Sequence, residues 1–334
     1  MYYSNKIDIL NSLFQDEDVH LEKERLIVGH NVYPIVEDVI ILLDPSQYPL
    51  GLDKRLKSAG INSTNKTFDY AEDVQYSFGS EWQKFPKVIP EHEKEFNQYF
   101  DLIDLDKLDG LRVCDLGCGI GRWSYFLKDV CRELILIDFS EAIFIARRNL
   151  AHTDKALFFM ADLMRLPFRN DFCDFMFCLG VLHHLPVPAL EVVRKLKKYA
   201  PWLLIYLYYA LDNRPLYFRY LHRISNALRL SLSKCRSPSF RDFFTWSAAL
   251  GVYLPFIALG KVFESRGLNT PIPLYETYRG KSIARIRQDV YDRFFTSIEQ
   301  RFSRAEIMKL EDTFDKVCIS EGLPYWHFVC RRES

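Results

Sequence analysis

Short runs of apolar residues alternate with helical patterns through the middle of the chain. Each run is rich in Ile, Leu, Val or Phe and predicts a buried strand. The runs lie at 113–116, 133–138, 156–160, 172–179 and 202–207. Strands that alternate with helices favour a parallel sheet with right-handed crossovers. The pattern therefore predicts an α/β core.

The core occupies residues 111–211, and the segments around it have other patterns. Residues 1–65 hold short apolar runs between turns and predict a small β-rich unit, and residues 66–110 form a lead-in segment. Residues 212–290 are mostly helical in pattern and rich in Tyr, Phe and Leu. An insertion after the fifth strand lies over the carboxyl ends of the strands, so we expect a lid above a site. Residues 291–334 complete the chain.

A glycine-rich turn follows the first predicted strand. The residues from Asp115 read D-L-G-C-G-I-G, and Gly117, Gly119 and Gly121 let the backbone run close to a ligand. The helix that follows presents unpaired N–H groups and the positive end of its dipole. The spacing differs from the G-x-G-x-x-G of dinucleotide sites, and the Asp115 carboxylate would repel a pyrophosphate and attract an ammonium group. A nicotinamide-dependent oxidoreductase is therefore disfavoured.

Three further strand ends carry polar residues. The second strand ends at Asp138, close to the roughly 20-residue spacing after the glycines at which a carboxylate binds a ribose diol. The third runs into A-D-L at 161–163, and the fourth runs into V-L-H-H-L at 181–185. With the glycine turn, these motifs resemble the class I S-adenosylmethionine (SAM) methyltransferases in order and spacing.

This resemblance implies a fold. The expected sheet has seven strands, mostly parallel with an antiparallel last strand, beside the small N-terminal β unit and the helical lid insertion. A capping box at Ser303–Glu306 opens a helix, and runs at 315–320 and 325–331 would form an antiparallel hairpin at the sheet edge.

The resemblance also implies SAM as the cofactor, and it assigns roles to the strand ends. Asp138 would accept from both ribose hydroxyls, with a strand-end turn residue as the alternative role. Asp162 would accept from the adenine amino group, with a helix N-cap as the alternative. The other implied contacts are Asp115, Gly117, Cys118, Gly119 and Gly121 around the amino-acid part, Phe139 and Leu163 at the adenine, and Cys178 and Leu179 at the methionine portion.

Two looser resemblances concern the N-terminal region. Tyr-Pro-Ile at 33–35 resembles the zinc-ribbon-like domain that precedes many bacterial methyltransferases, but the first cysteine is Cys114, so no metal is expected. The run at 76–85 resembles an F-G-x-E-W motif of some relatives, where Tyr76 and Trp82 would cover the cofactor or only pack the segment onto the sheet. A helix is expected at 96–105.

Methyl transfer from a sulfonium needs mainly proximity and orientation from the protein. His183 and His184 are candidate general bases, with His183 favoured, or they only pack and cap. Tyr291, in Y-D-R-F-F ahead of the final helix, is the favoured acceptor-side residue among the lid aromatics. The others are Tyr206, Tyr208, Tyr209, Tyr275, Tyr278, Phe294 and Phe295, for which core packing is the alternative.

Composition narrows the function classes. Lys+Arg and Asp+Glu both count 44, so the chain has no basic excess that would indicate a nucleic-acid partner. The eight cysteines contain no C-x-x-C pair, which disfavours zinc, and free thiols fit a cytoplasmic protein. The uncharged run at 243–260 is borderline for a membrane span. A buried lid helix is the main interpretation, without stable membrane insertion, and contact with a membrane or lipid-like substrate is the alternative.

The leading hypothesis is a methyltransferase acting on a small molecule of secondary or cell-surface metabolism. The first alternative uses SAM alone: its amine attacks its own γ-carbon, giving azetidine-2-carboxylate and methylthioadenosine. The second is a SAM-binding protein without catalysis. The sequence leaves the acceptor and the oligomeric state open.

Overall fold

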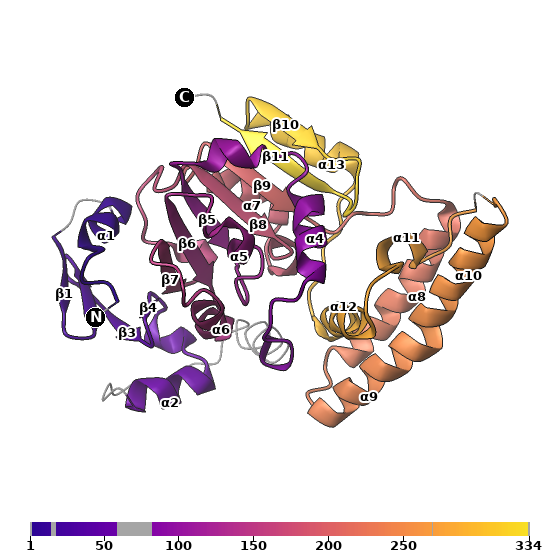
Figure 1. The fold of residues 1–334 in the computed structure, drawn as a ribbon, viewed down its shortest axis with the longest axis horizontal. Helices are drawn as coiled ribbons and strands as arrows, with labels where there is room; N and C mark the ends of the chain where they lie inside the picture. Colours follow the sequence, from indigo (N-terminus) through magenta and orange to yellow (C-terminus); the bar gives the residue numbers. More distant parts are fainter. Residues whose placement is uncertain (1, 15–17, 59–81, 269, 333–334) are drawn as a thin grey trace.

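The computed structural model describes residues 2–14, 18–58, 82–268 and 270–332. A central sheet has helices on both faces, with the N-terminal unit at one end of the molecule and a group of helices at the other (Figure 1). The strands are β1 Val19–Glu22, β2 Arg25–Val28, β3 Asn31–Val36, β4 Val39–Ile41, β5 Arg112–Leu116, β6 Glu133–Asp138, β7 Ala156–Met160, β8 Phe175–Leu179, β9 Trp202–Tyr206, β10 Lys316–Ile319 and β11 His327–Arg331.

Helices occur in the N-terminal unit, in the core and in the insertion. Those of the N-terminal unit and core are α1 Ile7–Leu13, α2 Leu50–Ser58, α4 Glu91–Tyr99, α5 Ser124–Leu127, α6 Ala142–Asn149, α7 Ala189–Leu196 and α13 Arg304–Met308. Those of the insertion are α8 Leu216–Leu232, α9 Pro238–Ala248, α10 Leu254–Ser265, α11 Tyr275–Tyr278 and α12 Ile283–Phe295. Short 3₁₀ turns are η1 Pro45–Gln47, η2 Leu105–Leu108, η3 Leu163–Arg165, η4 Leu182–His184 and η6 Lys309–Asp312.

The sheet runs in the order β1-β2-β3-β4-β7-β6-β5-β8-β9-β11-β10. From β4 to β9 neighbouring strands are parallel, and β11 is antiparallel to both β9 and β10. The predicted α/β core and the C-terminal hairpin are confirmed. The predicted count of seven strands was wrong for the whole sheet, because β4 pairs with β7 and adds the antiparallel strands β1–β4 to that edge.

Apolar side chains on the two faces of the sheet form two cores. One core joins α1, α7 and α13 to the sheet, and the other joins α2, α4, α5 and α6. Strand residues alternate between them, so Val113 contributes to the second core while Cys114 and Leu116 contribute to the first. This alternation also fixes where Asp115 points.

The insertion has a small core of its own. Helix α12 packs against α8 and α9, and α9 continues through a π-helical turn, η5 Ala249–Tyr253, into α10. Buried Tyr253, Ile286 and Phe295 lie at the centre of this cluster. The segment 212–290 holds α8 to α11 and the first part of α12, which runs across residue 290, where the insertion was expected to end.

Two local predictions differ from the structure. The helix expected at 96–105 is α4, Glu91–Tyr99, which begins directly after Pro90 and ends at Phe100. Phe100 leaves the helical conformation, and its ring stacks on Phe96 at 4.3 Å between centroids. The N-terminal unit contains helices α1 and α2 besides its four strands.

Candidate functional site

A cavity of about 920 Å³ opens at the carboxyl ends of the parallel strands. Ligands of open α/β sheets bind at this edge. The strand ends contribute Gly117, Asp138, Asp162, Leu179 and Tyr206 to its wall. The opposite end of the cavity is lined by the insertion, so it extends from the sheet into the space between α8 and α10.

The glycine turn has a left-handed backbone conformation that only glycine adopts readily. Gly117, Gly119 and Gly121 have φ of 79°, 54° and 71°. A Cβ on Gly119 would lie 3.1 Å from the Trp82 ring, and one on Gly121 would lie 3.1 Å from Leu150. Gly117, Cys118 and Gly119 line the cavity, while Gly121 packs inward against α6.

Asp138 lies in the cavity wall and organises the turn beside it. Its Oδ2 accepts from the Gly119 N–H at 2.7 Å, and its Oδ1 accepts from the Ser140 N–H at 2.8 Å and the Ser140 hydroxyl at 2.7 Å. Burial raises the pKa of this carboxyl, and the Ser140 and Gly119 hydrogen bonds oppose that rise. Asp138 therefore lies in the cavity wall, as predicted, and its carboxylate also holds the glycine turn in place.

Asp115 does not line the cavity, contrary to the expectation that it faces a ligand. Because β5 alternates, its side chain points toward α5, where it accepts from the Ser124 hydroxyl at 2.6 Å. It is 2% exposed, and burial raises the pKa of Asp115 to about 7.

Replacing Asp115 by Asn should stabilise the protein at pH 8. An Asp whose folded pKa is raised favours folding below that pKa, so stability falls as pH rises from about 4 to about 7. Asp115→Asn removes this titration, and we expect a gain of about 4 kcal/mol at pH 8 that shrinks toward pH 4. Urea unfolding across this range measures it. An equal gain at pH 5 and pH 8 would contradict the titration of Asp115.

At the adenine end of the expected site, Asp162 both caps a 3₁₀ turn and lies in the cavity wall. Asp162 caps η3, with Oδ1 accepting from the Met164 N–H at 2.9 Å, and it also lines the cavity with Phe139 and Leu163. Its Oδ2 accepts from the Gln47 side chain at 3.0 Å. The helix N-cap interpretation of Asp162 is confirmed, the adenine contact stays a prediction, and the N-terminal unit reaches this corner of the cavity through Gln47.

Of the other residues predicted to contact the cofactor, some lie in the cavity wall and some are buried in the core of the protein. Leu179 and Trp82 line the cavity, whereas Cys178 is fully buried inside the sheet. The guanidinium carbon of Arg122 lies 5.0 Å from the Trp82 ring centroid. Tyr76 lies outside the described residues. No cluster of three or more His, Cys, Asp or Glu in the described part of the chain has the geometry for a metal ion.

The two histidines of the V-L-H-H-L motif face different surroundings. His183 is fully buried, does not line the cavity and stacks on Tyr208 with 3.9 Å between ring centroids. Burial lowers the pKa of His183 well below its usual value. His184 lines the cavity, and its Nδ1 lies 2.7 Å from the Ile298 carbonyl oxygen. The structure thus places His184, and not the favoured His183, in the cavity wall.

Tyr291 also lies outside the cavity. Its hydroxyl accepts from Arg241 at 2.9 Å, and its ring belongs to the core of the insertion. The neighbouring Asp292 does line the cavity and accepts from the Tyr208 hydroxyl at 2.8 Å, while its Oδ1 lies 3.9 Å from His184 Nε2. No spacing in the sequence distinguishes Asp292 from Tyr291, so Asp292 was not predicted as a site residue.

Aromatic side chains surround the middle of the cavity. Tyr206 and Tyr99 meet edge to face with 5.1 Å between centroids, and Tyr99 lies 5.1 Å from Trp123. Burial raises the pKa of Tyr206 and Tyr208 well above the usual value, so both phenols stay protonated. Among the aromatics predicted for the lid, those that line the cavity are Tyr206, Tyr208, Tyr209, Tyr275, Tyr278 and Phe294.

A buried ion-pair cluster joins the core to the insertion across the cavity wall. Glu95 of α4 accepts from Arg285 of α12 at 3.0 and 3.1 Å, and Lys281 lies 2.7 Å from the same carboxylate. Arg285 also pairs with Asp289 one turn along α12. Burial would raise the pKa of Glu95, but Arg285 and Lys281 bring it down to about 2.

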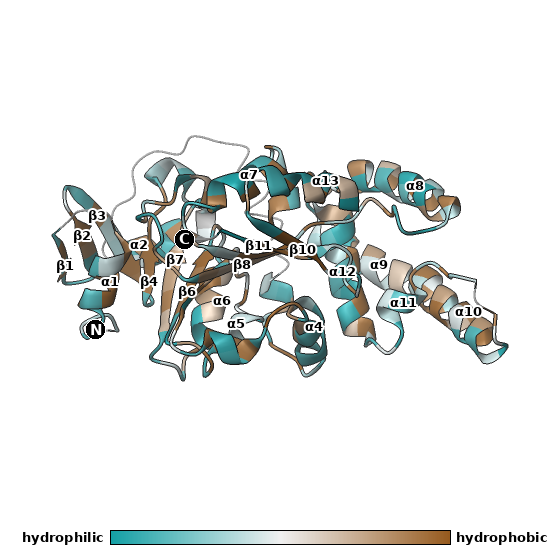
Figure 2. Cartoon of the chain, turned by 90° about the horizontal axis from the view of Figure 1, so that it is seen from above, coloured by the Kyte–Doolittle hydropathy of each residue, from teal (hydrophilic) through white to brown (hydrophobic). Residues whose placement is uncertain are grey.

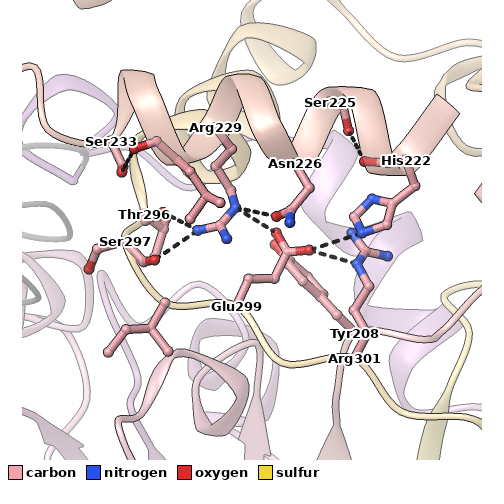
Figure 3. Close-up of polar contacts among 12 residues, drawn as sticks. Tyr208, His222, Ser225, Asn226, Arg229, Ser233, Thr296, Ser297, Glu299 and Arg301 are labelled. Atoms are coloured by element: carbon pink, nitrogen blue, oxygen red, sulfur yellow. Dashed lines mark hydrogen bonds and ion pairs between the residues drawn. The ribbon is translucent and has the colours of Figure 1, made fainter. Parts of the chain in front are cut away.

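A second charged cluster holds α8 at its base (Figure 3). Arg229 donates to the carbonyl oxygens of Thr296 and Ser297 at 2.8 and 2.9 Å. Its Nε lies 3.8 Å from Glu299, which also pairs with Arg301 at 2.6 Å. Burial opposes ionisation of Glu299, but Arg301 and Arg293 keep its pKa below the usual value.

Residues 113–200 match the protein family described as methyltransferase domain. The match spans β5 to the loop before β9 and contains the glycine turn, Asp138, Asp162 and both histidines. It covers the sheet end of the cavity and none of the insertion.

One curated relative is the tRNA U34 carboxymethyltransferase of Campylobacter hominis. It is 32% identical over 120 residues, which are 34% of this chain and 38% of that protein. The chain thus matches well under half the length of this relative.

Two solved structures are similar in fold. The magnesium protoporphyrin IX methyltransferase of Synechocystis PCC 6803 with bound SAH has a TM-score of 0.38 at 18% identity, covering 85% of this chain and 94% of that chain. The Haemonchus contortus phosphoethanolamine N-methyltransferase 1 has a TM-score of 0.34 at 18% identity, covering 40% and 32%.

Proposed function

We propose that this protein is a SAM-dependent methyltransferase that acts on a small molecule. One observation carries the proposal: the residues that match the methyltransferase domain build the sheet end of the cavity. The glycine turn and Asp138 meet there at 2.7 Å, which prepares a backbone cradle beside a buried carboxylate.

In this proposal SAM lies along the strand ends. Asp138 binds the ribose hydroxyls, Asp162 and Leu163 bind the adenine, and the backbone of Gly117 and Gly119 surrounds the amino-acid part. Tyr206 and Tyr99 present aromatic faces to the sulfonium, and cation–π attraction of this kind contributes about 1–2 kcal/mol when water is excluded. SAM supplies the methyl group and the leaving thioether.

The acceptor occupies the part of the cavity beneath the insertion, which acts as a lid. An acceptor heteroatom attacks the methyl carbon as the C–S bond breaks, and S-adenosylhomocysteine leaves. His184 accepts the proton that the acceptor loses. Its Nδ1 faces the Ile298 carbonyl and so carries the proton, which presents Nε2 as the basic atom, and Asp292 stabilises the imidazolium.

His184→Gln should lower kcat about 100-fold for an acceptor that must lose a proton, with SAM affinity unchanged. Steady-state kinetics and SAM titration calorimetry measure the two quantities. His152→Gln, at an exposed histidine away from the cavity, is the matched control and should retain full activity. Equal kcat for the His184 variant and wild type would exclude the base role.

The first experiment is incubation of the protein with SAM alone, followed by mass spectrometry of the nucleoside products. Tight SAM binding without turnover supports a methyltransferase that awaits its acceptor. Methylthioadenosine above the rate without enzyme would instead mean that SAM is attacked within its own amino-acid chain. No SAM binding would overturn the proposal.

Two further parts of the proposal concern the acceptor and its setting. We place the acceptor among small molecules of secondary or cell-surface metabolism, and the enzyme in the cytoplasm, where its free cysteines remain reduced. The Campylobacter hominis relative acts on tRNA according to its name. The present chain has a net charge of zero and so lacks the overall positive charge that would favour binding of a nucleic acid. Transfer assays with unmodified tRNA test that alternative directly.

A further inference from the structure

The insertion carries two helical arms that extend away from the sheet (Figure 1). The first arm is α8, and the second arm is α9, η5 and α10. Seen from above, the two arms lie apart at one end of the molecule, with α12 and α11 toward their base (Figure 2). The cavity is lined by Phe218 and Leu221 on the first arm and by Phe256 and Phe263 on the second, so it continues between them.

Both arms expose large apolar side chains. Leu216 is 76% exposed on the first arm, and Phe243 is 69% exposed on the second. Apart from Val32 and Ile283, every strongly exposed large apolar side chain in the described residues lies between 216 and 268: Leu216, Tyr217, Tyr220, Leu221, Ile224, Leu228, Leu230, Phe240, Phe243, Trp246, Leu250, Val252, Leu259, Val262 and Leu268. A patch of this kind marks an interaction surface.

The second arm is too exposed to be a core helix. Its helical run, Pro238–Ser265, is the only helix in the described ranges that is long and apolar enough to cross a membrane, yet only 28% of its most apolar window is buried. The prediction of a buried lid helix for the 243–260 run is thus wrong for most of its surface. Water would face these side chains unless a partner covers them.

The arms are also basic. From 216 to 265 the chain has seven Lys and Arg against two Asp and Glu, whereas the whole chain has 44 of each. Both acids are already paired, Asp242 with Arg287 at 2.5 Å and Glu264 with Arg279 at 2.7 Å. Exposed Arg223, Lys234 and Lys261 have no ion pair within the described residues. The surface therefore combines exposed apolar side chains with positive charge.

Buried arginines anchor the inner faces of both arms to the protein. Arg241 is 2% exposed and donates to the Cys235 carbonyl at 2.7 Å and to the Tyr291 hydroxyl. Arg229 does the same for the first arm through Thr296 and Ser297. A membrane-spanning orientation of the second arm would pull Arg241 from these partners, so the arms suit a position in the plane of an interface.

We propose that the two arms bind the surface of an anionic lipid bilayer, and that an amphiphilic acceptor enters the cavity between them from that layer. The entry of an acceptor from the bilayer rests on the proposed methyl transfer. Apolar side chains enter the headgroup and acyl boundary while Lys and Arg contact anionic lipid phosphates. Leu221 and Val252 are exposed and also line the cavity, so the apolar surface continues from the outside of the arms into the site.

Other partners fit less of this surface. A nucleic acid would engage the basic side chains but would leave Phe243, Leu250 and Ile224 in water. A second copy of the chain would have to place its own basic arms against these, because an isologous contact joins the same patch on both subunits. Charge complementarity therefore favours anionic lipid.

Flotation of the full-length protein with vesicles tests the proposal. Vesicles of phosphatidylcholine alone are compared with vesicles containing phosphatidylglycerol, at low and high salt. We expect binding to the anionic vesicles that weakens at high salt, because salt screens the attraction between exposed charges. The same samples are titrated with SAM, so loss of lipid binding is distinguishable from failure of the proposed cofactor site.

Paired variants separate the apolar and electrostatic contributions. Phe243→Gln with Leu250→Gln should lower the fraction bound at least tenfold. Arg223→Gln with Lys261→Gln should lower it about tenfold on anionic vesicles and weaken its salt dependence. Val32→Gln, at the exposed apolar side chain of the N-terminal unit, is the matched control and should bind like wild type. Unchanged thermal unfolding and SAM affinity show that each variant is folded.

Three results would overturn the proposal. The first is the absence of vesicle binding by a folded protein that binds SAM. The second is a dimer in light scattering that Phe243→Gln with Leu250→Gln dissociates, which would assign the apolar surface to a second copy. The third is binding of tRNA that competes with anionic vesicles and does not depend on the apolar variants.

Discussion

Asp138→Ala should weaken SAM binding about 1,000-fold while leaving the protein folded. In the proposed site the carboxylate accepts from two ribose hydroxyls, and each charge-assisted hydrogen bond contributes about 1.5–3 kcal/mol. The variant also removes the acceptor of the Gly119 N–H, so the glycine turn loses the contact that holds it beside the cavity. Titration calorimetry of SAM, with the product S-adenosylhomocysteine as a second ligand, measures the loss.

A neighbouring carboxylate provides the control. Glu141 lies three residues along the chain, outside the cavity wall, and contacts Arg55 at 3.4 Å. Glu141→Ala should bind SAM like wild type. Unchanged affinity in Asp138→Ala would show that the cofactor register assigned to the strand ends is wrong, even if the protein binds SAM elsewhere.

Glu95→Ala should destabilise the protein by about 3–5 kcal/mol and loosen the insertion. The change leaves Arg285 buried without its main carboxylate, and an unpaired buried charge is expensive. Because Glu95 bridges α4 and α12, we expect faster proteolytic cleavage between α8 and α10. Urea unfolding and limited proteolysis report the two effects.

The pH dependence of the stability loss shows whether the Glu95–Arg285 ion pair causes it. The folded pKa of Glu95 is lowered to about 2, so its contribution to stability is complete above the unfolded value near 4.5 and is lost as pH falls toward 2. The stability gap between wild type and Glu95→Gln should therefore narrow below about pH 4. Glu93→Ala, at an exposed carboxylate of the same helix, is the control. Equal losses in the Glu93 and Glu95 variants would exclude the ion pair.

The strands of the core were predictable because each one is a short apolar run between helical patterns. The predicted bounds 133–138 and 156–160 coincide with β6 and β7. The sheet extension was not predictable in the same way. Ile40 pairs with Phe159, and no local pattern indicates which edge a small antiparallel unit will join.

The candidate site was predictable where it depends on strand ends and unpredictable where it depends on side-chain direction. Asp138 and Asp162 reach the cavity as expected from their positions. Asp115 turns toward Ser124, and His183 turns inward, because strand alternation and a 3₁₀ turn decide which neighbour faces the cavity. The Glu95–Arg285 pair joins residues 190 positions apart, so it has no sequence signal.

The attachment of the N-terminal unit has a consequence for biosynthesis. The Tyr2 hydroxyl donates to the Ala156 carbonyl at 2.8 Å, Lys6 donates to the same oxygen at 3.1 Å, and β4 completes one side of β7. A ribosome adds about 5–20 residues per second, so the first strands wait several seconds before β7 emerges. During that interval their apolar faces are open to chaperones, so the first segment translated reaches its final partner only after β7 has been made.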